Sequence, residues 1–346
     1  MLPPPTFRMS KVSRFSFVCT LATFAACAST PATNLSAGPN APAASGLPPL
    51  AGVSTPTPIA SAIPFVSLEG PLWVPSEGGY LLFSDVVEGN GAAAKIYKYT
   101  PAAQQFAVLP YPAPVPVSTN GLAMDSHGFL LACERYNARV VRLEGPQKLV
   151  VLADRWPSDK KVPAAPPLAA PNDLAVRPDG NIYFSDSDWG AREGVAHAPM
   201  GVYRIDPAGT LSRILDIEKP NGVALSPDGA FLYIGSDVQS KVWRMPLDAQ
   251  GSPGIPSLFI DGATVPGGFK VPDGICIDDS GDLYVTNNDD AISAILVFDS
   301  AGHPKARIPF PQRPSNCTFG GNDRKTLFVT TLHAIYQVQM PVSGLP

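Results

Sequence analysis

Six polar residues recur along the chain at similar intervals, and each one opens an apolar run. They lie 43 to 52 residues apart, and the side chain of each carries an oxygen atom. If the fold brings them together, they offer the hard oxygen ligands that Ca²⁺ takes, and without His or Cys they favour zinc less. The spacing therefore predicts a polar centre that binds a divalent cation. We call the six the ring residues: Glu69, Asn120, Asn172, Asn221, Asp273 and Asn316.

A hairpin turn is the competing interpretation of each position, because Asn-Gly is a common turn pair. Turn chemistry does not account for all six, since Asn172 is followed by Asp173 and Asn316 by Cys317. None of the six positions is apolar, which favours the polar centre.

Each ring residue begins a repeated unit that determines the fold class. After it come an apolar run, a turn, a second apolar run and a third, such as 94–101 and 201–207. The runs are short and rich in Val, Ile, Tyr, Phe and Leu, which favours strands over helices. Turn residues such as Asp179 and Asp228 separate the first two runs. Six copies of a unit with four short strands predict an all-β fold, a six-bladed β-propeller with four-stranded blades.

The sixth unit ends soon after its third strand, so its blade lacks one strand. The apolar run at 59–67 precedes the first unit and is free to supply that strand. The ring would then be closed by an N-terminal strand in the last blade, which leaves no open sheet edge at the joint. In a propeller the first strand of each blade lines the central channel, so we expect the ring residues to meet at one axis.

Further polar residues end the second run of the first five units. We expect them to cap loops, at the end of the strands opposite the ring residues. They are Asp85, Glu134, Asp186, Asp237 and Asn287.

Two connections, 154–171 and 187–200, are long for a propeller. Each is a candidate lid over the channel, and an ordinary surface loop is an equally good interpretation. Arg135, together with Trp189 and Arg192 in the second connection, is a candidate residue of the channel mouth.

The first 28 residues have the pattern of an export signal. Lys11 and Arg14 precede a charge-free apolar stretch that is too short to span a bilayer comfortably. Cys27 follows in a context that fits either ordinary cleavage or lipidation of that cysteine. Residues 29–58 are uncharged and rich in Ala and Pro, which predicts a flexible spacer before a propeller domain at 59–342. We expect an exported protein, periplasmic or extracellular, that touches a membrane only if Cys27 is acylated.

Charge and cysteine content exclude other classes of partner and site. From residue 65 onward the chain has 22 Lys and Arg against 29 Asp and Glu, whereas nucleic-acid binding needs an excess of basic residues. Cys133, Cys276 and Cys317 lie in apolar runs without metal or disulfide spacing, so we expect buried thiols. The sequence gives no indication of the oligomeric state.

Five segments carry a recognisable pattern: EGPLW at 69–73, PND at 171–173, PNGVALSPDG at 220–229, PDGICIDDSGDLYV at 272–285 and NCTFGG at 316–321. In order and spacing they resemble the gluconolactonase family, which also includes regucalcin, or senescence marker protein. The resemblance looks closest to the bacterial gluconolactonase branch. It implies one divalent ion held by Glu69, Asn172, Asn221 and Asp273, with Asn120 and Asn316 as substrate or outer groups.

The chain also departs from that family's pattern. Regucalcin-like members have a sugar-binding Arg shortly before the first Asn ligand, where this chain has Ala170 and Pro171. Related bacterial members often follow a Cys-Glu pair with His, and here Arg135 takes that place. These departures leave the identity of the substrate open.

The resemblance and the ring together predict a metal-dependent hydrolase that opens a sugar-type lactone. The ion, Ca²⁺ by preference and otherwise Zn²⁺, Mg²⁺ or Mn²⁺, would act as a Lewis acid, with Asp273 as base or nucleophile. Asn120, Asn316, Arg135 and Trp189 would bind the lactone. The alternatives are a phosphotriesterase or other lactonase on the same site, or a non-catalytic ligand-binding propeller. No Gly-x-Ser-x-Gly segment supports a serine hydrolase.

Overall fold

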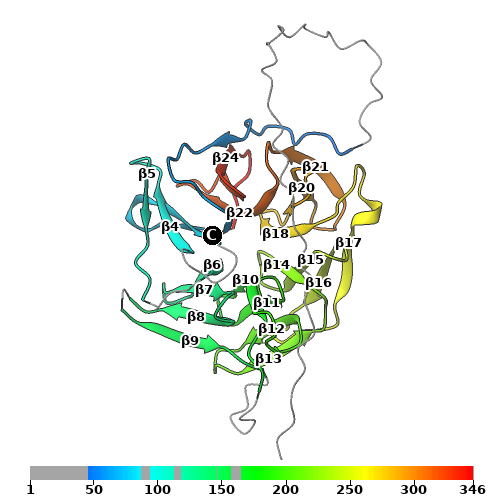
Figure 1. The fold of residues 1–346 in the computed structure, drawn as a ribbon. Helices are drawn as coiled ribbons and strands as arrows, with labels where there is room; N and C mark the ends of the chain where they lie inside the picture. The colour runs from blue at the N-terminus through cyan, green and yellow to red at the C-terminus, as the bar shows by residue number, and fades with distance from the viewer. Residues whose placement is uncertain (1–45, 87–93, 113–117, 146, 157–164, 346) are drawn as a thin grey trace, which may run out of the picture. The chain divides into compact units, whose positions relative to one another are not determined.

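A computed structural model describes residues 46–86, 94–112, 118–145, 147–156 and 165–345 of the chain. In these residues six antiparallel sheets of four strands are arranged in a ring (Figure 1). This confirms the predicted six-bladed β-propeller. Each blade is a meander whose first strand is innermost.

The strands of blades 1 to 3 follow one another in chain order. Blade 1 consists of β2 (Leu68–Val74), β3 (Tyr80–Asp85), β4 (Lys95–Thr100) and β5 (Gln105–Val108). Blade 2 consists of β6 (Thr119–Met124), β7 (Leu130–Glu134), β8 (Arg139–Leu143) and β9 (Leu149–Ala153). Blade 3 consists of β10 (Ala170–Val176), β11 (Ile182–Ser187), β12 (Gly201–Ile205) and β13 (Leu211–Leu215).

Blades 4 and 5 repeat this plan, and blade 6 combines the two ends of the propeller. Blade 4 consists of β14 (Pro220–Leu225), β15 (Phe231–Ser236), β16 (Lys241–Pro246) and β17 (Ser257–Asp261). Blade 5 consists of β18 (Pro272–Ile277), β19 (Leu283–Asn287), β20 (Ala294–Phe298) and β21 (Pro304–Pro309). Blade 6 consists of β22 (Pro314–Gly320), β23 (Thr326–Thr331), β24 (Ile335–Gln339) and β1 (Thr57–Pro58). Two 3₁₀ turns, Ser76–Gly78 and Gly262–Thr264, complete the assigned elements.

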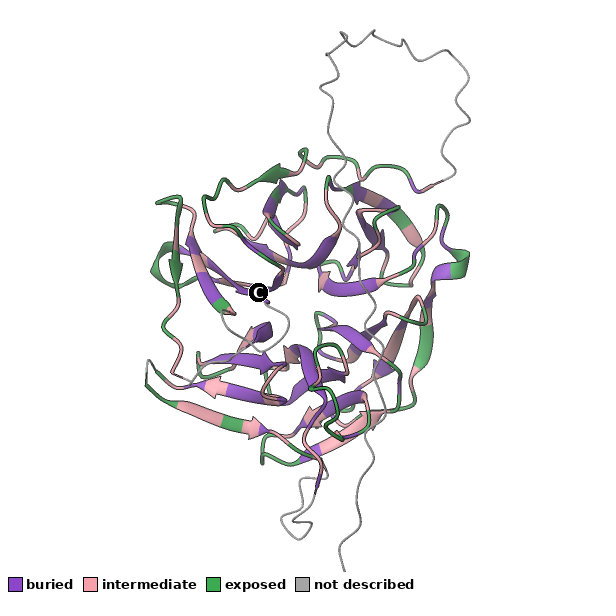
Figure 2. Cartoon of the chain, in the orientation of Figure 1, coloured by how far each residue is buried: buried purple, intermediate pink, exposed green. Residues whose placement is uncertain are grey.

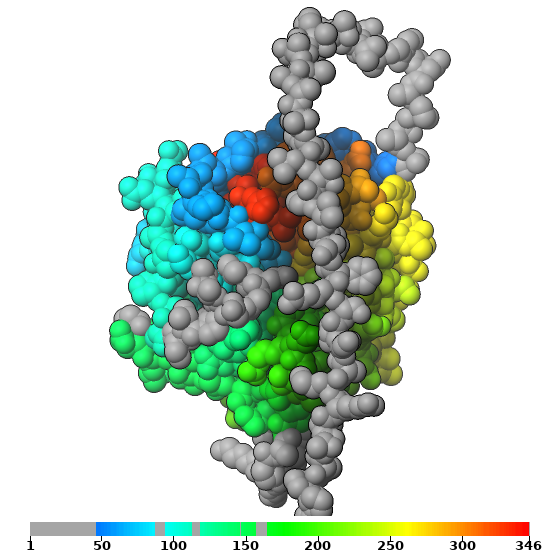
Figure 3. All heavy atoms as spheres, viewed as in Figure 1, coloured from blue at the N-terminus to red at the C-terminus, as the bar shows by residue number. Residues whose placement is uncertain are grey.

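The predicted closure by an N-terminal strand is confirmed, although the strand lies slightly earlier than expected. β1 pairs with β24 through Thr57 and Pro58, and the Ile59 N–H continues the pairing to the Ile335 carbonyl at 2.8 Å. The rest of the 59–67 run does not form a strand. Phe65 packs between blades instead, edge-on to the rings of Phe83 and Tyr97. In Figure 3 the blue atoms of the N-terminal segment accordingly lie beside the red atoms of the C-terminal blade.

Part of the segment expected to be a spacer packs on the propeller. Leu47 is buried against the core of blade 5, and the Arg307 N–H in β21 donates to the Pro48 carbonyl. The Leu50 N–H returns a bond to the Arg307 carbonyl at 2.9 Å. The N-terminal part of the proposed spacer and the export signal lie outside the described residues.

The hydrophobic core lies between neighbouring blades. Leu131 and Val140 of blade 2, for example, share one cluster with Leu174 and Phe184 of blade 3. The first and second strands of each blade are therefore covered on both faces. The outermost strands β5, β9 and β17 are partly exposed (Figure 2). This gradient explains the continuous apolar runs of the inner strands, because a strand that is buried on both faces has no polar face to alternate with.

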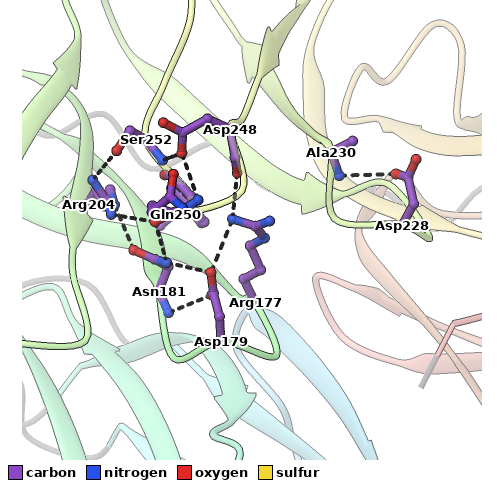
Figure 4. A network of polar contacts seen from close by, with 11 residues as sticks. Arg177, Asp179, Asn181, Arg204, Asp228, Ala230, Asp248, Gln250 and Ser252 are labelled. Atoms are coloured by element: carbon purple, nitrogen blue, oxygen red, sulfur yellow. Dashed lines mark hydrogen bonds and ion pairs between the residues drawn. The ribbon is translucent and has the colours of Figure 1, made fainter.

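The turns between first and second strands contain the residues that the sequence placed there. Asp179 accepts hydrogen bonds from Asn181 in the turn of blade 3, and Asp228 accepts one from the Ala230 N–H in the turn of blade 4 (Figure 4). The same network ties the two blades together, since Arg177 donates to the Asp248 carbonyl at 3.0 Å. No helix in the described part of the chain is long and apolar enough to cross a bilayer.

Candidate active site in the channel

The ring residues stand at or near the start of the six innermost strands, and all six are 2–9% exposed. In blades 2 to 5 the pairing of the first with the second strand shifts at the ring residue, which forms a β-bulge. A bulge releases a residue from the regular alternation and redirects its side chain. The bulges therefore free the ring residues from the interblade faces.

Glycines after the ring residues let the innermost strands approach one another closely. A Cβ on Gly70 would lie 2.1 Å from the carbonyl oxygen of Asn120 in the next blade. A Cβ on Gly222 would lie 2.1 Å from the carbonyl oxygen of Asp273. No side chain fits at these positions, so the glycines set the narrow spacing of the ring.

A side-chain contact closes the ring between the last blade and the first. The Asn316 amide donates to Glu69 Oε2 at 3.4 Å, and the Ser315 hydroxyl donates to the Leu68 carbonyl at 2.6 Å. Neighbouring blades are thus in contact at this level around the circle, which supports the expectation that the ring residues face one axis.

Carboxylates accumulate at the centre, where Arg135 offsets part of their negative charge. Burial and the neighbouring Asp173 carboxylate raise the pKa of Glu69 to about 7, although Arg135, the Gly70 N–H and the Asn316 amide act in the opposite direction. Burial and the Glu69 carboxylate also raise the pKa of Asp273 well above its usual range. The fold therefore keeps at least two carboxyl groups buried close together. A bound cation would relieve the repulsion between their negative charges.

A third carboxylate, that of Asp173, lies in the same centre and was not assigned a role from the sequence. Burial raises its pKa to about 6, and its carboxylate accepts N–H bonds from Leu174 at 2.9 Å and Val223 at 3.3 Å. It occupies the bulge position that glycine fills in blades 1, 2, 4 and 5. The signal was therefore present in the repeat alignment, as an acid where the other units have a glycine or a cysteine.

Asn288 is a second residue that sequence reasoning missed. Its amide nitrogen donates to Asp273 Oδ2 at 2.6 Å, and its own Oδ1 is buried without a hydrogen-bond partner among the described residues. The residue follows the end of β19, at the repeat position that Arg135 occupies after β7 in blade 2. That shared position is the signal in the sequence that could have found it.

Of the polar residues expected to end the second strands, Asp85, Asp186 and Asn287 cap loops as predicted, whereas Glu134 binds the side chains of Tyr111, Asn137 and Arg139 and Asp237 follows its strand; the predicted location at the end away from the ring residues was wrong. Because each first and second strand form an antiparallel hairpin, the end of one lies beside the start of the other, as in the pairing of Pro171 with Asp186. Asp186 accepts N–H bonds from Ala169 and Ala170 at 2.9 and 2.8 Å. Asp85 and Asn287 hold the equivalent backbone in blades 1 and 5. In blades 1, 3 and 5 these side chains hold the backbone segment that leads into the ring residue.

The candidate mouth residues divide into two groups. Arg135 is buried, acts electrostatically on Glu69 and donates from Nε to the Trp189 carbonyl at 2.9 Å. Trp189 is 38% exposed and has the Lys219 ammonium 3.8 Å from its ring centroid. Arg192 is exposed, and no contact in the described residues brings it to the centre.

The two candidate lids are joined to each other. The Ala198 N–H donates to the Pro167 carbonyl at 2.7 Å. Residues 157–164 lie outside the described part, so the structure does not test whether these connections move over the channel.

A cavity of about 550 Å³ lies in the channel beyond the ring residues, along the part of the innermost strands that follows them in the chain. Asp173 and Asn316 line it at the ring level, and the remaining lining is mainly apolar, with Leu122, Val176 and Ile277 among its residues. The cavity thus begins where the charged centre ends.

The centre fits a hard cation on the chemistry of its donors. The side-chain ligand atoms that the ring residues offer are carboxylate and amide oxygens. Of these, Asn120 Oδ1 is buried without a hydrogen-bond partner among the described residues. In the described residues no three His, Cys, Asp or Glu side chains form a metal-binding group, so any ion would rely on amide and backbone oxygens besides carboxylates.

The fold and centre define a six-bladed propeller with a polar, acid-rich channel. Comparison with family models extends this assignment, because residues 68–333 match the family described as "SMP-30/Gluconolactonase/LRE-like region". The chain belongs to this family, which confirms the resemblance found in the sequence.

Individual relatives are similar over most of their length. The gluconolactonase of Zymomonas mobilis is 28% identical over 299 residues, which cover 80% of this chain and 79% of that one. The solved structure of a gluconolactonase from Xanthomonas campestris has a TM-score of 0.67 and 27% identity, and covers 86% of this chain and 98% of that one. A regucalcin from Agrobacterium tumefaciens, 21% identical with a TM-score of 0.67, shares the fold over 87% of this chain and 97% of that one.

Proposed function

We propose that the chain is a hydrolase that opens a sugar-type lactone with one divalent cation in the channel. The observation that carries the proposal is the buried pair of Glu69 and Asp273 among amide oxygens, with acids whose pKa values burial has raised. The names of the relatives support the lactone, since they include a gluconolactonase that is similar over most of the chain.

Glu69, Asn172, Asn221 and Asp273 would hold the cation. Ca²⁺ suits these ligands best, and Zn²⁺, Mg²⁺ or Mn²⁺ are alternatives. When bound, the cation would supply Lewis-acid polarisation of the lactone carbonyl. Asp173 and Asn288 would position the ligands from outside, because Asn288 holds Asp273 Oδ2 and Asp173 repels Glu69.

Asp273 would act as the base in ring opening. A water oxygen attacks the carbonyl carbon, the Asp273 carboxylate takes the proton of that water, and the ring carbon–oxygen bond breaks. The leaving alkoxide then receives the proton, so that the product is a hydroxy acid. A direct attack by the Asp273 carboxylate is the alternative, and trapping of a mixed anhydride with hydroxylamine would identify it.

Four residues would orient the lactone. Asn120 and Asn316 present amides at the ring level, and Asn120 Oδ1 is free to accept a bond from a sugar hydroxyl. Arg135 and Trp189 would contact the substrate from the mouth, joined through the Arg135 Nε bond.

The experiment is proton release from a panel of sugar lactones, because a hydroxy acid ionises as it forms. We expect turnover with Ca²⁺, loss of turnover with a chelator and recovery when metal is restored. Asp273→Asn should abolish turnover, whereas Asp216→Asn, at a side chain 88% exposed, should retain it. If the Asp273→Asn variant opened the lactone as fast as the unchanged protein, the assignment of Asp273 as the base would be rejected.

The panel also separates the alternatives. Turnover of phosphotriesters but not of sugar lactones would favour a different bond on the same site. Binding without turnover of any ester would favour a ligand-binding propeller, which has no need for the buried acids.

Export is a separate proposal that rests on residues outside the described part. The charged start, the apolar stretch at 15–26 and Cys27 support it. A mass measurement of the mature N-terminus tests both processing and acylation. An intact Met1 or Met9 on protein isolated from the producing cells would contradict it.

A further inference from the structure

Two cysteines from neighbouring blades meet at the wall of the channel. Cys276 lies in β18 of blade 5 and Cys317 in β22 of blade 6, and their sulfur atoms are 2.7 Å apart. Both are free thiols, as is Cys133. Cys133 is fully enclosed in the core between blades 2 and 3, so the pair is distinct among the described cysteines.

The fold fixes this approach of the two strands. A Cβ on Gly274 would lie 2.6 Å from the Cα of Asn316, so only glycine allows β18 and β22 to lie so close. The Thr286 hydroxyl contacts the Gly274 carbonyl at 3.2 Å and the Ser315 carbonyl at 2.8 Å, which joins the two blades beside the cysteines. The thiol contact is therefore a consequence of the ring spacing.

We propose that Cys276 and Cys317 form a disulfide that links blade 5 to blade 6. A disulfide bond is about 2.05 Å long, so the sulfur atoms have to approach by only about 0.6 Å. Two thiolates on one zinc ion each lie about 2.3 Å from the metal. A tetrahedral site would then separate the sulfurs by more than the 2.7 Å observed. The geometry favours the covalent bond over a shared metal.

The cavity gives a reagent access to the pair. Both cysteines line the space of about 550 Å³ beyond the ring, and Cys276 is only partly buried. Its thiolate would attack a small-molecule or protein disulfide, which releases one thiol and leaves a mixed disulfide on Cys276. The Cys317 thiolate would then attack the Cys276 sulfur and release the second thiol. Two protein thiols are oxidised, and the reagent disulfide is reduced to two thiols.

The reaction is expected to be slow in the folded protein. Burial and the adjacent Cys317 raise the pKa of the Cys276 thiol well above its usual range, so the reactive thiolate is scarce. The bond closes a loop of 41 residues between strands that start at Pro272 and Pro314. Such a link restricts the unfolded chain and should raise Tm by roughly 5 °C or more.

The test uses the full chain, unfolded and reduced, then refolded in a buffer of reduced and oxidised glutathione. Free thiols are alkylated under denaturing conditions, and the peptides are mapped by mass spectrometry. We expect one cross-linked peptide pair that joins Cys276 to Cys317, about 2 Da lighter than the sum of its reduced parts. Tm should fall on reduction of the unchanged protein and of Cys133→Ala, but not of Cys276→Ser or Cys317→Ser.

Complete alkylation of both cysteines after refolding would overturn the proposal. So would a map in which either one is linked to Cys19, Cys27 or Cys133 instead. The peptide map of the unchanged protein decides the question even if a serine variant fails to fold. Neither result bears on lactone turnover, so this proposal stands or falls apart from the proposed function.

Discussion

The two ends of the channel are built by the same six strands and have opposite chemistry. At the strand starts, buried acids and amides lie beside closely packed glycines, and the Glu69 carboxylate raises the pKa of Asp273. A few residues further along, Leu122, Val176 and Ile277 line an open and mainly apolar cavity. Each of these short strands thus passes from a polar residue to a hydrophobic wall, so position along the strand determines the chemistry of the channel lining.

Removal of a ring carboxylate should have the largest effect on lactone turnover. If turnover did not change, the contrast between a charged, catalytic end and an apolar end of the channel would be wrong. Glu69→Gln preserves size but removes a charge that would hold the cation. We expect lactone turnover to fall by roughly 10²-fold to 10⁴-fold, and the melting temperature to stay the same or rise as the repulsion with Asp173 and Asp273 is relieved. Proton-release kinetics and thermal unfolding in chelator measure the two effects. A lower melting temperature with unchanged turnover would make Glu69 a structural residue.

Asp173 tests where the charged end of the channel stops. It has no direct place among the proposed ligands, but its carboxylate acts on Glu69 and accepts the Val223 N–H. Asp173→Asn should weaken cation affinity by roughly 10-fold to 100-fold, as removal of outer-shell partners does. Calorimetric titration with Ca²⁺ measures this, with Asp216→Asn as the matched surface control. Unchanged affinity would restrict the site to the ring residues.

Asp186 allows a test by pH, because its carboxyl group holds the Ala169 and Ala170 N–H groups beside the ring. Burial raises its pKa to about 7, above the usual value of 3.8 for an unfolded chain. Its contribution to stability is therefore fully present below about pH 4 and is lost as the pH rises through 7. Asn287 accepts the equivalent two backbone N–H bonds through its amide oxygen, so Asp186→Asn can preserve these bonds.

The free energy of unfolding of the unchanged protein should thus fall relative to that of Asp186→Asn, by about 1 kcal/mol per pH unit between pH 4 and 7. Urea unfolding at several pH values in this window measures the difference. Parallel curves for the two proteins would show that Asp186 does not titrate on folding.

The apolar end should tolerate substitution with the smallest effect. Ile277→Val removes one methylene group from a buried residue that lines the cavity. We expect a loss of about 1 kcal/mol in stability and no change in lactone turnover. Urea unfolding and the proton-release assay check both. A clear loss of turnover would extend the catalytic region beyond the ring.

The sequence was sufficient for features that repeat and insufficient for those that occur once. Six aligned units predicted the blades, the turns at Asp179 and Asp228, and the place of the ring residues at the starts of the innermost strands, because equivalent positions have equivalent surroundings. Asn288 occupies the repeat position of Arg135, but its bond to Asp273 depends on the side chains of that one blade, which the repeat does not indicate. Asp85, Asp186 and Asn287 were assigned the right role and the wrong end of the strands, because in an antiparallel hairpin the end of the second strand lies beside the start of the first.

The last blade is assembled from both ends of the propeller sequence, so the circle is fastened by hydrogen bonds and packing at a single seam. That seam joins β1 to β24 at the outer edge of blade 6, while Glu69 and Asn316 connect the first and last blades at the channel. A circularly permuted chain that opens at the exposed Asp216 instead would keep every strand pair and move the seam between blades 3 and 4. Glu69 and Asn316 would then sit in the interior of a continuous chain, and the weakest joint of the ring would lie next to Asn172 and Asn221.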